Sequence, residues 1–288
     1  MSQETPPRTT SGLTSTTSVP LYWVRYGEPG TTPLLVLHGG PGADHGYLLP
    51  QMLRLAAGRE VTFYDQRGGG RSRTDDREPV GWRDHVADLS LVASELVPRP
   101  FDLLGYSWGG LLALLYLLDA PGAPRPERVV LVDPAPMSRR HRAQFEAEFA
   151  RRLAAPELRA LRDELAVSGL RERDPERYRK RLFELGVAAY FADPSRAHDL
   201  TPFRVVARVQ DSVWDSLGDY DLLPRLNEVR LPVLIVHGRQ DPIPPDSSER
   251  ATRALPNAHL VTLEDCGHVP YVESPDALFS SIDAFLTR

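Results

Sequence analysis

The stretch Gly105-Tyr106-Ser107-Trp108-Gly109 decides the fold of this chain. It has the pattern G-x-S-x-G, preceded by the strand-length apolar run 101–104 and followed by the helix-length apolar run 111–118. A serine between such a strand and helix lies on a sharp turn that exposes its hydroxyl. Glycines flank it because a Cβ there would collide with neighbouring backbone. The pattern predicts a nucleophilic serine, and the alternative is a plain tight turn.

Two residues of the C-terminal part complete a candidate catalytic triad with Ser107. In this architecture the acid and then the histidine follow the serine along the chain. Asp241 follows the strand-like run 233–236, and His268 follows the run 259–263. Loops after parallel strands meet at the edge of the sheet where ligands bind. We expect His268 to be the general base and Asp241 to fix its tautomer.

Three other residues compete for these roles. Asp133 follows the strand-like run 128–132 and is the rival acid, because some proteins of this architecture carry the acid there. His237 precedes the acid at a strand end, which is typical of a packed histidine. Cys266 lacks the turn of a nucleophile, so we expect it to pack. As the single cysteine it can form no intramolecular disulfide, which fits a reducing compartment.

The loop His38-Gly39-Gly40-Pro41-Gly42 follows another strand-like run, 34–37, and predicts part of an oxyanion hole. Such a hole takes one N–H from the residue after the nucleophile and one from the loop after an earlier strand. Trp108 N–H and Gly40 N–H are the expected donors. The alternative for the glycine run is a flexible turn without a catalytic role.

Strand and helix patterns alternate over most of the chain, which predicts a mostly parallel central sheet flanked by helices on both faces. The last helix opens at Ser274-Pro275, with serine as N-cap and proline at the first helical position. The expected strands are 21–26, 34–37, 61–64, 101–104, 128–132, 233–236 and 259–263, and the expected helices between them are 47–57, 83–97, 108–120 and 246–255.

This alternation stops between residues 134 and 224. Leucines recur there at helical spacing, as in Leu158, Leu161 and Leu165. We expect residues 134–224 to form a helical cap inserted into a core made of residues 19–133 and 225–288. The first 18 residues are rich in Ser, Thr and Pro, have no apolar segment, and are expected to be a disordered tail.

Three blocks of this sequence resemble those of a known family. They are 38–42, Asp65-Gln66-Arg67-Gly68 with Gly70-Arg71-Ser72, and the serine stretch extended to Gly110. Together they look like the signature blocks of proline iminopeptidases and the related tricorn-interacting aminopeptidase factors, members of the α/β-hydrolase superfamily. The resemblance implies an α/β-hydrolase fold with a cap. It also implies a serine peptidase that releases N-terminal residues, often proline, from short peptides, with esterase or amidase activity on small acyl substrates.

The chain departs from this family where the substrate's free amine is bound. Some relatives carry a glutamate directly after the catalytic aspartate, and here that residue is Pro242. The Trp-Glu pair often found in the cap of bacterial proline iminopeptidases is not evident. The cap still offers carboxylates, namely Glu184, Asp193, Asp211 and Asp215.

For the substrate pocket we expect contributions from Gly39, Tyr106 and Trp214. Further aromatic residues could line it from the cap or from below, although aromatic residues at such spacing often only pack. These are Tyr190, Phe191 and Phe203 in the cap, with Trp108 and Tyr271 below.

Composition excludes several other classes. The net charge of −5 gives no reason to expect nucleic acid or an anionic membrane as partner, and no apolar run reaches 18 residues. The sequence holds no H-E-x-x-H or Cys/His cluster and no phosphate-binding glycine loop, so we expect no metal and no cofactor. Ser107 argues against the epoxide hydrolases and dehalogenases of this fold, which use an aspartate nucleophile.

Three functions remain open from the sequence. The first is a proline iminopeptidase-like aminopeptidase acting on short peptides in the cytoplasm. The second is a carboxylesterase or amidase that acts on small acyl compounds without needing a free amine. The third is a small-molecule-binding protein that kept the fold without catalysis, which an intact set of Ser107, Asp241 and His268 disfavours.

Overall fold

A single eight-stranded sheet forms the centre of the molecule, for which the computed structural model describes residues 8–28, 32–75, 78–97 and 100–287. The strand order is β1-β2-β4-β3-β5-β6-β7-β8. The pairs β1–β2 and β2–β4 are antiparallel and all other pairs are parallel, which confirms the predicted mostly parallel sheet. The strands are β1 (Arg8–Leu13), β2 (Tyr22–Tyr26), β3 (Leu34–Leu37), β4 (Val61–Tyr64), β5 (Asp102–Tyr106), β6 (Val129–Val132), β7 (Val233–Gly238) and β8 (Ala258–Leu263).

The central strands β3, β5, β6 and β7 are buried along their whole length, as expected of apolar runs covered on both faces. Their register brings the carboxyl ends together: Leu37 pairs with Gly105, and Tyr106 pairs with Val132. The loops that follow these strands therefore meet at one edge of the sheet. These loops carry the residues that the sequence predicts to be catalytic.

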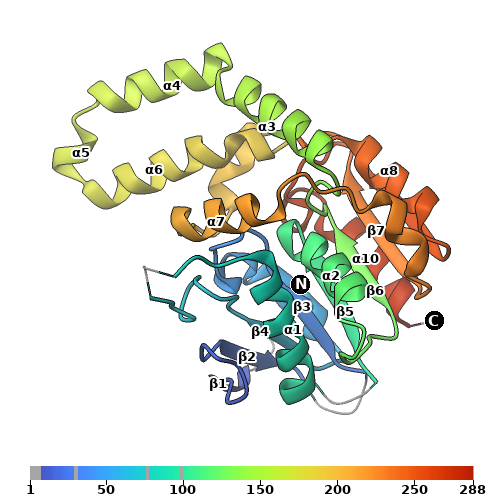
Figure 1. The fold of residues 1–288 in the computed structure, drawn as a ribbon. Helices are drawn as coiled ribbons and strands as arrows, with labels where there is room; N and C mark the ends of the chain where they lie inside the picture. Colours follow the sequence, from blue (N-terminus) through green and yellow to red (C-terminus); the bar gives the residue numbers. More distant parts are fainter. Residues whose placement is uncertain (1–7, 29–31, 76–77, 98–99, 288) are drawn as a thin grey trace.

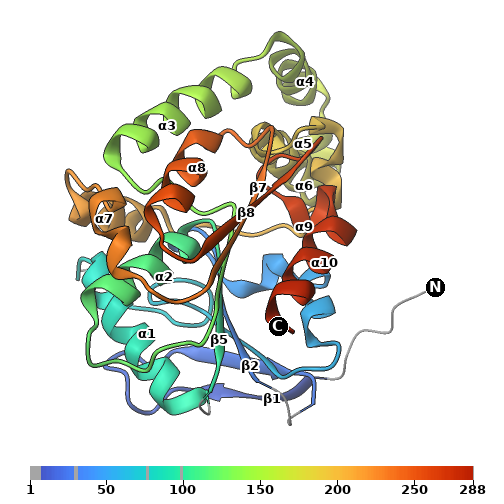
Figure 2. The same ribbon diagram turned by 90° about the vertical axis from the view of Figure 1, so that its right-hand side faces the viewer.

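Helices cover both faces of the sheet (Figures 1 and 2). On one face lie α1 (Trp82–Leu96), α2 (Trp108–Asp119) and α8 (Pro245–Ala254). On the other lie α9 (Pro270–Glu273) and α10 (Pro275–Leu286). All of α2 except its last residue is buried, because this helix is apolar around its whole circumference and packs on the centre of the sheet.

A helical insertion between β6 and β7 rises above the edge where the catalytic loops meet (Figure 1). Pro156 and Pro175 begin two of its helices, and Asp174 accepts a hydrogen bond from Arg177 N–H as a cap. At its base Arg139 N–H donates to Tyr220 O, and Leu222 N–H donates to Met137 O. The helices are α3 (Arg139–Leu153), α4 (Pro156–Val167), α5 (Leu170–Arg173), α6 (Pro175–Val187) and α7 (Ala207–Leu217), with short 3-10 helices at Ala188–Tyr190, Pro194–Asp199 and Leu223–Glu228.

Two expectations about the N-terminal part were wrong. The predicted disordered tail 1–18 contains strand β1, which pairs with β2, while residues 1–7 lie outside the described part. After the strand, Ser15 N–H and Thr16 N–H both donate to the Glu95 carboxylate. The predicted helix 47–57 is instead two 3-10 helices, His45–Leu48 and Gln51–Ala56, because Pro50 interrupts it.

Among the helices that the structure describes, none combines the length and apolar character needed to cross a bilayer.

Candidate active site

Ser107 lies at the turn between β5 and α2 with φ +53° and ψ −119°, a backbone conformation that non-glycine residues rarely adopt. The turn is sharp, and it brings the backbone of β5, α2 and β3 so close together that no side chain fits at the flanking glycines. A Cβ on Gly105 would lie 2.3 Å from Gly109 O, and one on Gly109 would lie 2.3 Å from Leu37 O. The strain at Ser107 and the bare glycines around it are the features of a nucleophile elbow.

The three predicted triad residues lie in one hydrogen-bonded chain. His268 Nε2 is 2.9 Å from Ser107 Oγ, and His268 Nδ1 is 2.7 Å from Asp241 Oδ2. Because Asp241 only accepts when ionised, Nδ1 carries the proton and Nε2 is left to accept the serine hydroxyl hydrogen. Burial lowers the pKa of His268 below its ordinary value, which keeps the imidazole neutral before the reaction.

The rival residues have other partners. Asp133 Oδ1 accepts Gly238 N–H, and no hydrogen bond joins it to His268 in the described part of the chain. His237 lies between Ser248 Oγ at 2.9 Å and Ile243 O at 3.2 Å, as expected of a packed histidine. Cys266 is buried, and burial raises the pKa of its thiol, so it is not poised as a nucleophile.

Asp133, His237 and Asp241 offer three buried ligand atoms within 4.8 Å of one another. Most of these atoms already have hydrogen-bonding partners: the His237 nitrogens contact Ser248 and Ile243, and the Asp241 oxygens accept from His268 and Ile243 N–H. These buried atoms are therefore largely satisfied by hydrogen bonds to neighbouring side chains and backbone groups.

One expected oxyanion donor directly follows Ser107 in the chain, and the other lines the cavity beside it. Trp108 is the first residue of α2, and Gly40, at φ +126°, lines the same cavity as Ser107 and His268. Neither Gly40 N–H nor Trp108 N–H has a hydrogen-bond acceptor in the parts of the chain that the structure describes. Free N–H groups at a helix start can bind a developing negative charge.

Gln66 links His38, at the start of the loop 38–42, to the side chain of Trp108, a role that the sequence pattern did not predict. Its backbone N–H donates to His38 Nε2 at 3.0 Å, and its side-chain amide donates to His38 O at 2.7 Å. Its amide oxygen accepts Trp108 Nε1–H at 2.8 Å. The block beginning at Asp65 therefore holds the glycine loop and the start of α2 in fixed relation.

The cavity beside Ser107 has a volume of about 210 Å³. Trp214 lines it, as predicted, and so does Tyr190, whose ring stacks on that of His268 at a centroid distance of 5.1 Å. The insertion also places two carboxylates there. Asp211 was among the predicted candidates, whereas Glu146 on α3 was missed because nothing in its local sequence distinguishes it from a solvent-facing helix residue.

Several expected pocket residues do not line this cavity. Tyr106 is buried beneath the site, and its hydroxyl donates to His268 O. Gly39 N–H donates to the Tyr47 hydroxyl, and a Cβ at Gly39 would lie 3.0 Å from Ser107 Cβ. Both residues support the site from below. The aromatic residues that also lie outside the cavity lining are Phe191, Phe203, Trp108 and Tyr271.

The other acidic candidates also lie outside the cavity. Glu184 forms an ion pair with Arg181 at 2.9 Å, and Asp193 accepts Ser195 N–H as the cap of a 3-10 helix. Asp215 is exposed one turn after Asp211 on α7. Of the four predicted acids, Asp211 alone contributes to the cavity lining.

Comparison with known proteins identifies the family of this chain. The alpha/beta hydrolase family matches residues 34–281, most of the chain. The chain belongs to the alpha/beta hydrolase family. Within that family it is proline iminopeptidase-like: the proline iminopeptidase of Lactobacillus delbrueckii subsp. lactis is 30% identical over 263 residues, covering 84% of this chain and 85% of that protein.

Solved structures share the fold. A proline iminopeptidase-related protein from Thermus thermophilus is 23% identical with a TM-score of 0.72, covering 98% of each chain. An esterase from Exiguobacterium antarcticum is 20% identical with a TM-score of 0.69, covering 94% of this chain and 96% of the other. The family match and the curated relatives make this chain a hydrolase of the family.

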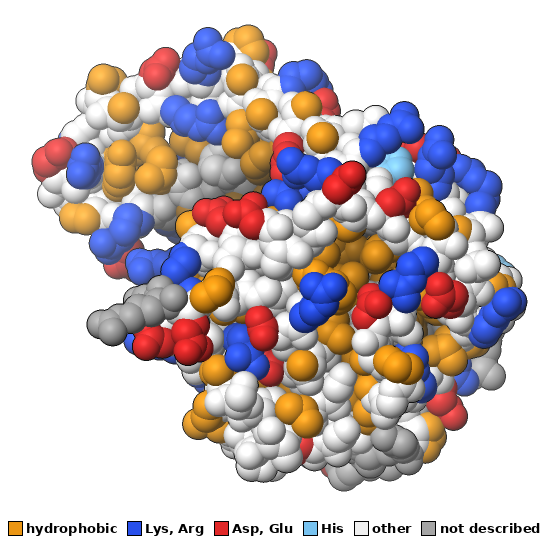
Figure 3. All heavy atoms as spheres, viewed as in Figure 1, with side chains coloured by type: hydrophobic (Ala, Val, Ile, Leu, Met, Phe, Trp, Pro, Cys, Tyr) orange, Lys and Arg blue, Asp and Glu red, His pale blue; other side chains and the backbone are white. Residues whose placement is uncertain are grey.

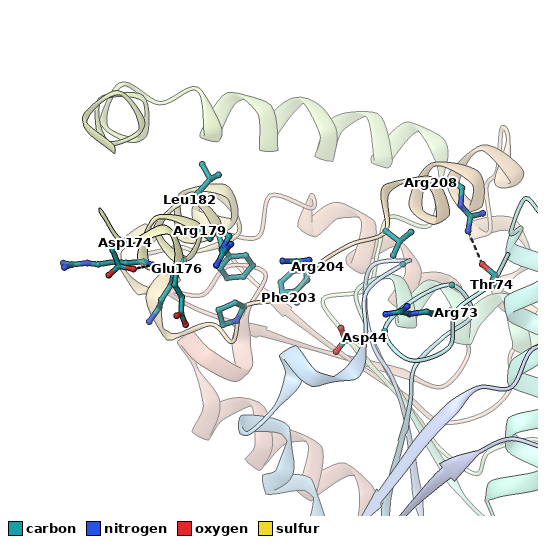
Figure 4. Close-up of a pocket in the computed structure, with 18 residues that line it drawn as sticks. Asp44, Arg73, Thr74, Asp174, Glu176, Arg179, Leu182, Phe203, Arg204 and Arg208 are labelled. Carbon is teal, nitrogen blue, oxygen red and sulfur yellow. Dashed lines mark hydrogen bonds between the residues drawn. The ribbon is translucent and has the colours of Figure 1, made fainter. Parts of the chain in front are cut away.

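A larger cleft of this hydrolase lies apart from the reacting side chains. It has a volume of about 1330 Å³ and runs between α6 and the loops around Asp44 and Arg73 (Figures 3 and 4). Arg179 and Arg204 lie near Phe203 on one side, and Arg208 donates to Thr74 Oγ1 on the other. None of the three triad residues lines this cleft, whereas Ser107 and His268 line the smaller cavity.

The insertion is fixed to the loop that carries His268. His268 N–H donates to Tyr190 O at 2.7 Å. The Glu273 carboxylate accepts Gly267 N–H at 2.7 Å, and from the insertion it accepts Ala192 N–H at 2.9 Å and Asp193 N–H at 3.1 Å. Glu273 therefore acts as a clamp between the histidine loop and the insertion.

Replacing Glu273 with glutamine should reduce kcat roughly tenfold and lower stability by about 1–3 kcal/mol. The amide keeps one accepting oxygen, but its NH₂ group must face a backbone N–H that loses its acceptor. Thermal unfolding and ester turnover measure both effects.

The matched control is Glu264→Gln, whose carboxylate is exposed and pairs with Arg239 on the surface. This change should alter stability by no more than about 0.5 kcal/mol. Equal behaviour of the two variants would exclude the clamp.

Proposed function

We propose that this hydrolase is a proline iminopeptidase-like serine aminopeptidase that releases N-terminal residues from short peptides through an acyl-enzyme. The observation that carries the proposal is the hydrogen-bonded chain Ser107–His268–Asp241, at 2.9 and 2.7 Å, opening into a cavity that also holds two carboxylates. The curated relatives at 26–30% identity are named proline iminopeptidases, which supports this choice of activity.

The proposed reaction uses each residue in turn. His268 Nε2 takes the Ser107 proton as Oγ attacks the substrate carbonyl, and Gly40 N–H and Trp108 N–H stabilise the oxyanion. His268 then gives the proton to the leaving amine. Water, activated by the same imidazole, attacks the acyl-enzyme, and the collapse of the second oxyanion returns Ser107. Asp241 stabilises the imidazolium that forms in each half of the reaction.

Glu146 and Asp211 are the groups proposed to bind the free amine of the substrate. They reach the cavity from two different helices of the insertion, α3 and α7. A charge-assisted hydrogen bond to an ammonium group is stronger than one between neutral groups. A substrate whose amine is acylated loses that interaction.

The test is turnover of proline p-nitroanilide against its N-acetylated form, with p-nitrophenyl butyrate reporting the nucleophile. We expect the free amine to be preferred roughly 100-fold in kcat/KM, which corresponds to about 2.7 kcal/mol of binding energy. Cleavage of the ester with neither anilide turned over would reject the aminopeptidase function and leave a serine hydrolase.

The carboxylates are tested by Glu146→Gln and Asp211→Asn. Each should lower kcat/KM for the free amine about tenfold while leaving butyrate ester hydrolysis within about twofold. Asp215→Asn, one turn further along α7 and outside the cavity, is the control. If the control matches the two cavity variants, amine binding does not reside at these positions.

A carboxylesterase is the second candidate, and one contact favours it. Glu146 Oε1 is 2.7 Å from Arg142 Nε, so one of the two proposed amine-binding carboxylates already has a cationic partner. Arg142 is held over the Trp214 ring at 4.3 Å. If this ion pair persists when substrate binds, the cavity would suit an acyl group without a free amine.

A further inference from the structure

Asp133 is a fully buried carboxyl group beside the triad to which the proposed reaction gives no role. It follows β6 with φ +41°, a left-handed conformation that is uncommon for residues other than glycine. An oxygen of Asp133 lies within 4.8 Å of one of Asp241. A side-chain hydrogen bond couples the two carboxyl groups when one of them carries a proton. Asp133 Oδ2 faces no donor in the described part of the structure.

Two carboxylates at this separation and without solvent cannot both be ionised. Asp241 is the carboxyl group that is better stabilised in its ionised form, because it accepts hydrogen bonds from His268 Nδ1–H and Ile243 N–H. Within the described residues, Asp133 accepts a single hydrogen bond, from Gly238 N–H at Oδ1. The proton therefore belongs on Asp133 Oδ2, the oxygen that otherwise has no partner.

The neighbouring histidine does not neutralise the pair. Ile243 O can only accept, so His237 Nε2 carries the hydrogen and Nδ1 accepts from the Ser248 hydroxyl. Burial lowers the pKa of His237 to about 4, so this ring is neutral. Within the described residues, the other titratable or charged groups around the two carboxyls are His268 and Cys266 after β8, Tyr106 at the end of β5, Tyr190 at the end of the 3-10 helix Ala188–Tyr190, Tyr271 and Glu273 on α9, and Arg152 on α3.

We propose that Asp133 is a positioning residue that stays protonated and donates a hydrogen bond to Asp241. The two carboxyl groups then hold one negative charge, fixed on the oxygens that face His268. The catalytic consequence rests on the proposed triad, whereas the shared proton is a property of the folded protein. This assigns a second buried acid to the site, behind the first.

The protonation state is tested without activity. A protonated carboxylic acid has a carbonyl stretching band that a carboxylate lacks, and it can be assigned by ¹³C-labelled aspartate. At neutral pH we expect this band in the difference spectrum between wild type and Asp133→Asn. Asp102→Asn, which removes another buried carboxyl, is the control and should leave the assigned band in place. Absence of the band from the wild type minus Asp133→Asn spectrum would overturn the proposal, whatever the enzyme's substrate.

The effect on catalysis is tested by alanine and asparagine at position 133. Alanine removes the donor and should lower kcat for the ester about tenfold. Asparagine can accept Gly238 N–H and donate to Asp241, so it should restore most of that loss. If asparagine is as weak as alanine while both proteins melt like the wild type, a donated hydrogen bond is not what Asp133 supplies.

A double variant separates charge from geometry. In Asp241→Asn, Asp133 no longer faces a carboxylate, so it can ionise. Its negative charge can then stabilise the His268 imidazolium, with the new asparagine side chain lying between the two groups. The double variant Asp133→Asn with Asp241→Asn has neither charge, and we expect its kcat to be at least about tenfold below that of Asp241→Asn. Equal rates for the single and double variants would count against the shared charge.

Discussion

Replacing Ser107 with alanine should lower kcat for p-nitrophenyl butyrate by roughly 10⁵-fold and leave the fold unchanged. The expected loss is this large because the nucleophile and the base act as a unit, so that His268 has no proton to take once Oγ is gone. The residual rate should come from the oxyanion donors and from substrate binding. Alanine removes one oxygen that is partly exposed, which explains why stability should hardly change.

Labelling by a fluorophosphonate, followed by intact mass, measures the same residue independently of any substrate. The wild type should gain one adduct and the alanine variant none. Ser94→Ala, an exposed position on α1 whose hydroxyl donates to Ser90 O, is the control and should be labelled like the wild type. Adduct on the alanine variant, or turnover above about 1% of wild type, would assign the nucleophile to another residue. A wild type that neither turns over esters nor takes the label would instead favour a binding protein that kept the fold.

The elbow and the triad could be predicted from sequence because each depends on a short local pattern. A buried strand shows as an apolar run, and a parallel sheet brings the ends of such runs to one edge. The order of Ser107, Asp241 and His268 along the chain then places three loops together without any knowledge of distances. The hydrogen bonds of 2.9 and 2.7 Å confirm that these side chains meet.

Residues that act through long-range contacts could not be found in this way. Glu146 reaches the cavity because α3 crosses above the sheet, and its neighbours in sequence are ordinary polar helix residues. Gln66 contacts His38, 28 residues before it in the chain, and Trp108, 42 residues after it. The pairing of Asp133 with Asp241 depends on two strand ends lying side by side. Each of these contacts is set by tertiary packing, which a local sequence pattern does not report.

The N-terminal strand was missed for a different reason, because the amino-acid composition of this segment is typical of a disordered tail. Residues 8–13 contain serine, threonine and glycine, which suggest a disordered tail. They form an edge strand because the neighbouring β2 offers unpaired backbone groups, and main-chain pairing does not depend on apolar side chains. The predicted helix 47–57 failed at Pro50, where the break is local and could have been read from the sequence.

Gly109→Ala should lower stability by about 3 kcal/mol or more and also slow the reaction in the protein that remains folded. The new Cβ would lie 2.3 Å from Leu37 O and 2.8 Å from His38 O, distances that real Cβ atoms do not show. The atoms that the new Cβ would meet belong to the backbone of β3 and of the loop 38–42, which carries the Gly40 donor. No side-chain rotation can therefore relieve the close contacts. The loop must move, and with it the Gly40 N–H that faces the developing oxyanion, so kcat should fall more than about tenfold.

Gly186→Ala is the matched control for this effect. It lies in α6, and a Cβ there would meet nothing within 4 Å, so alanine should raise stability by about 0.5–1 kcal/mol through its better helix propensity. Thermal unfolding and ester turnover of both variants separate the close contact from the general cost of losing a glycine. If Gly109→Ala melted and reacted like the wild type, the tight contact between α2 and the end of β3 could not be what holds the oxyanion loop beside Ser107. If Gly109→Ala lowers stability while Gly186→Ala raises it, the close contact between the Gly109 position and the backbone of β3 is what holds the loop 38–42 beside Ser107.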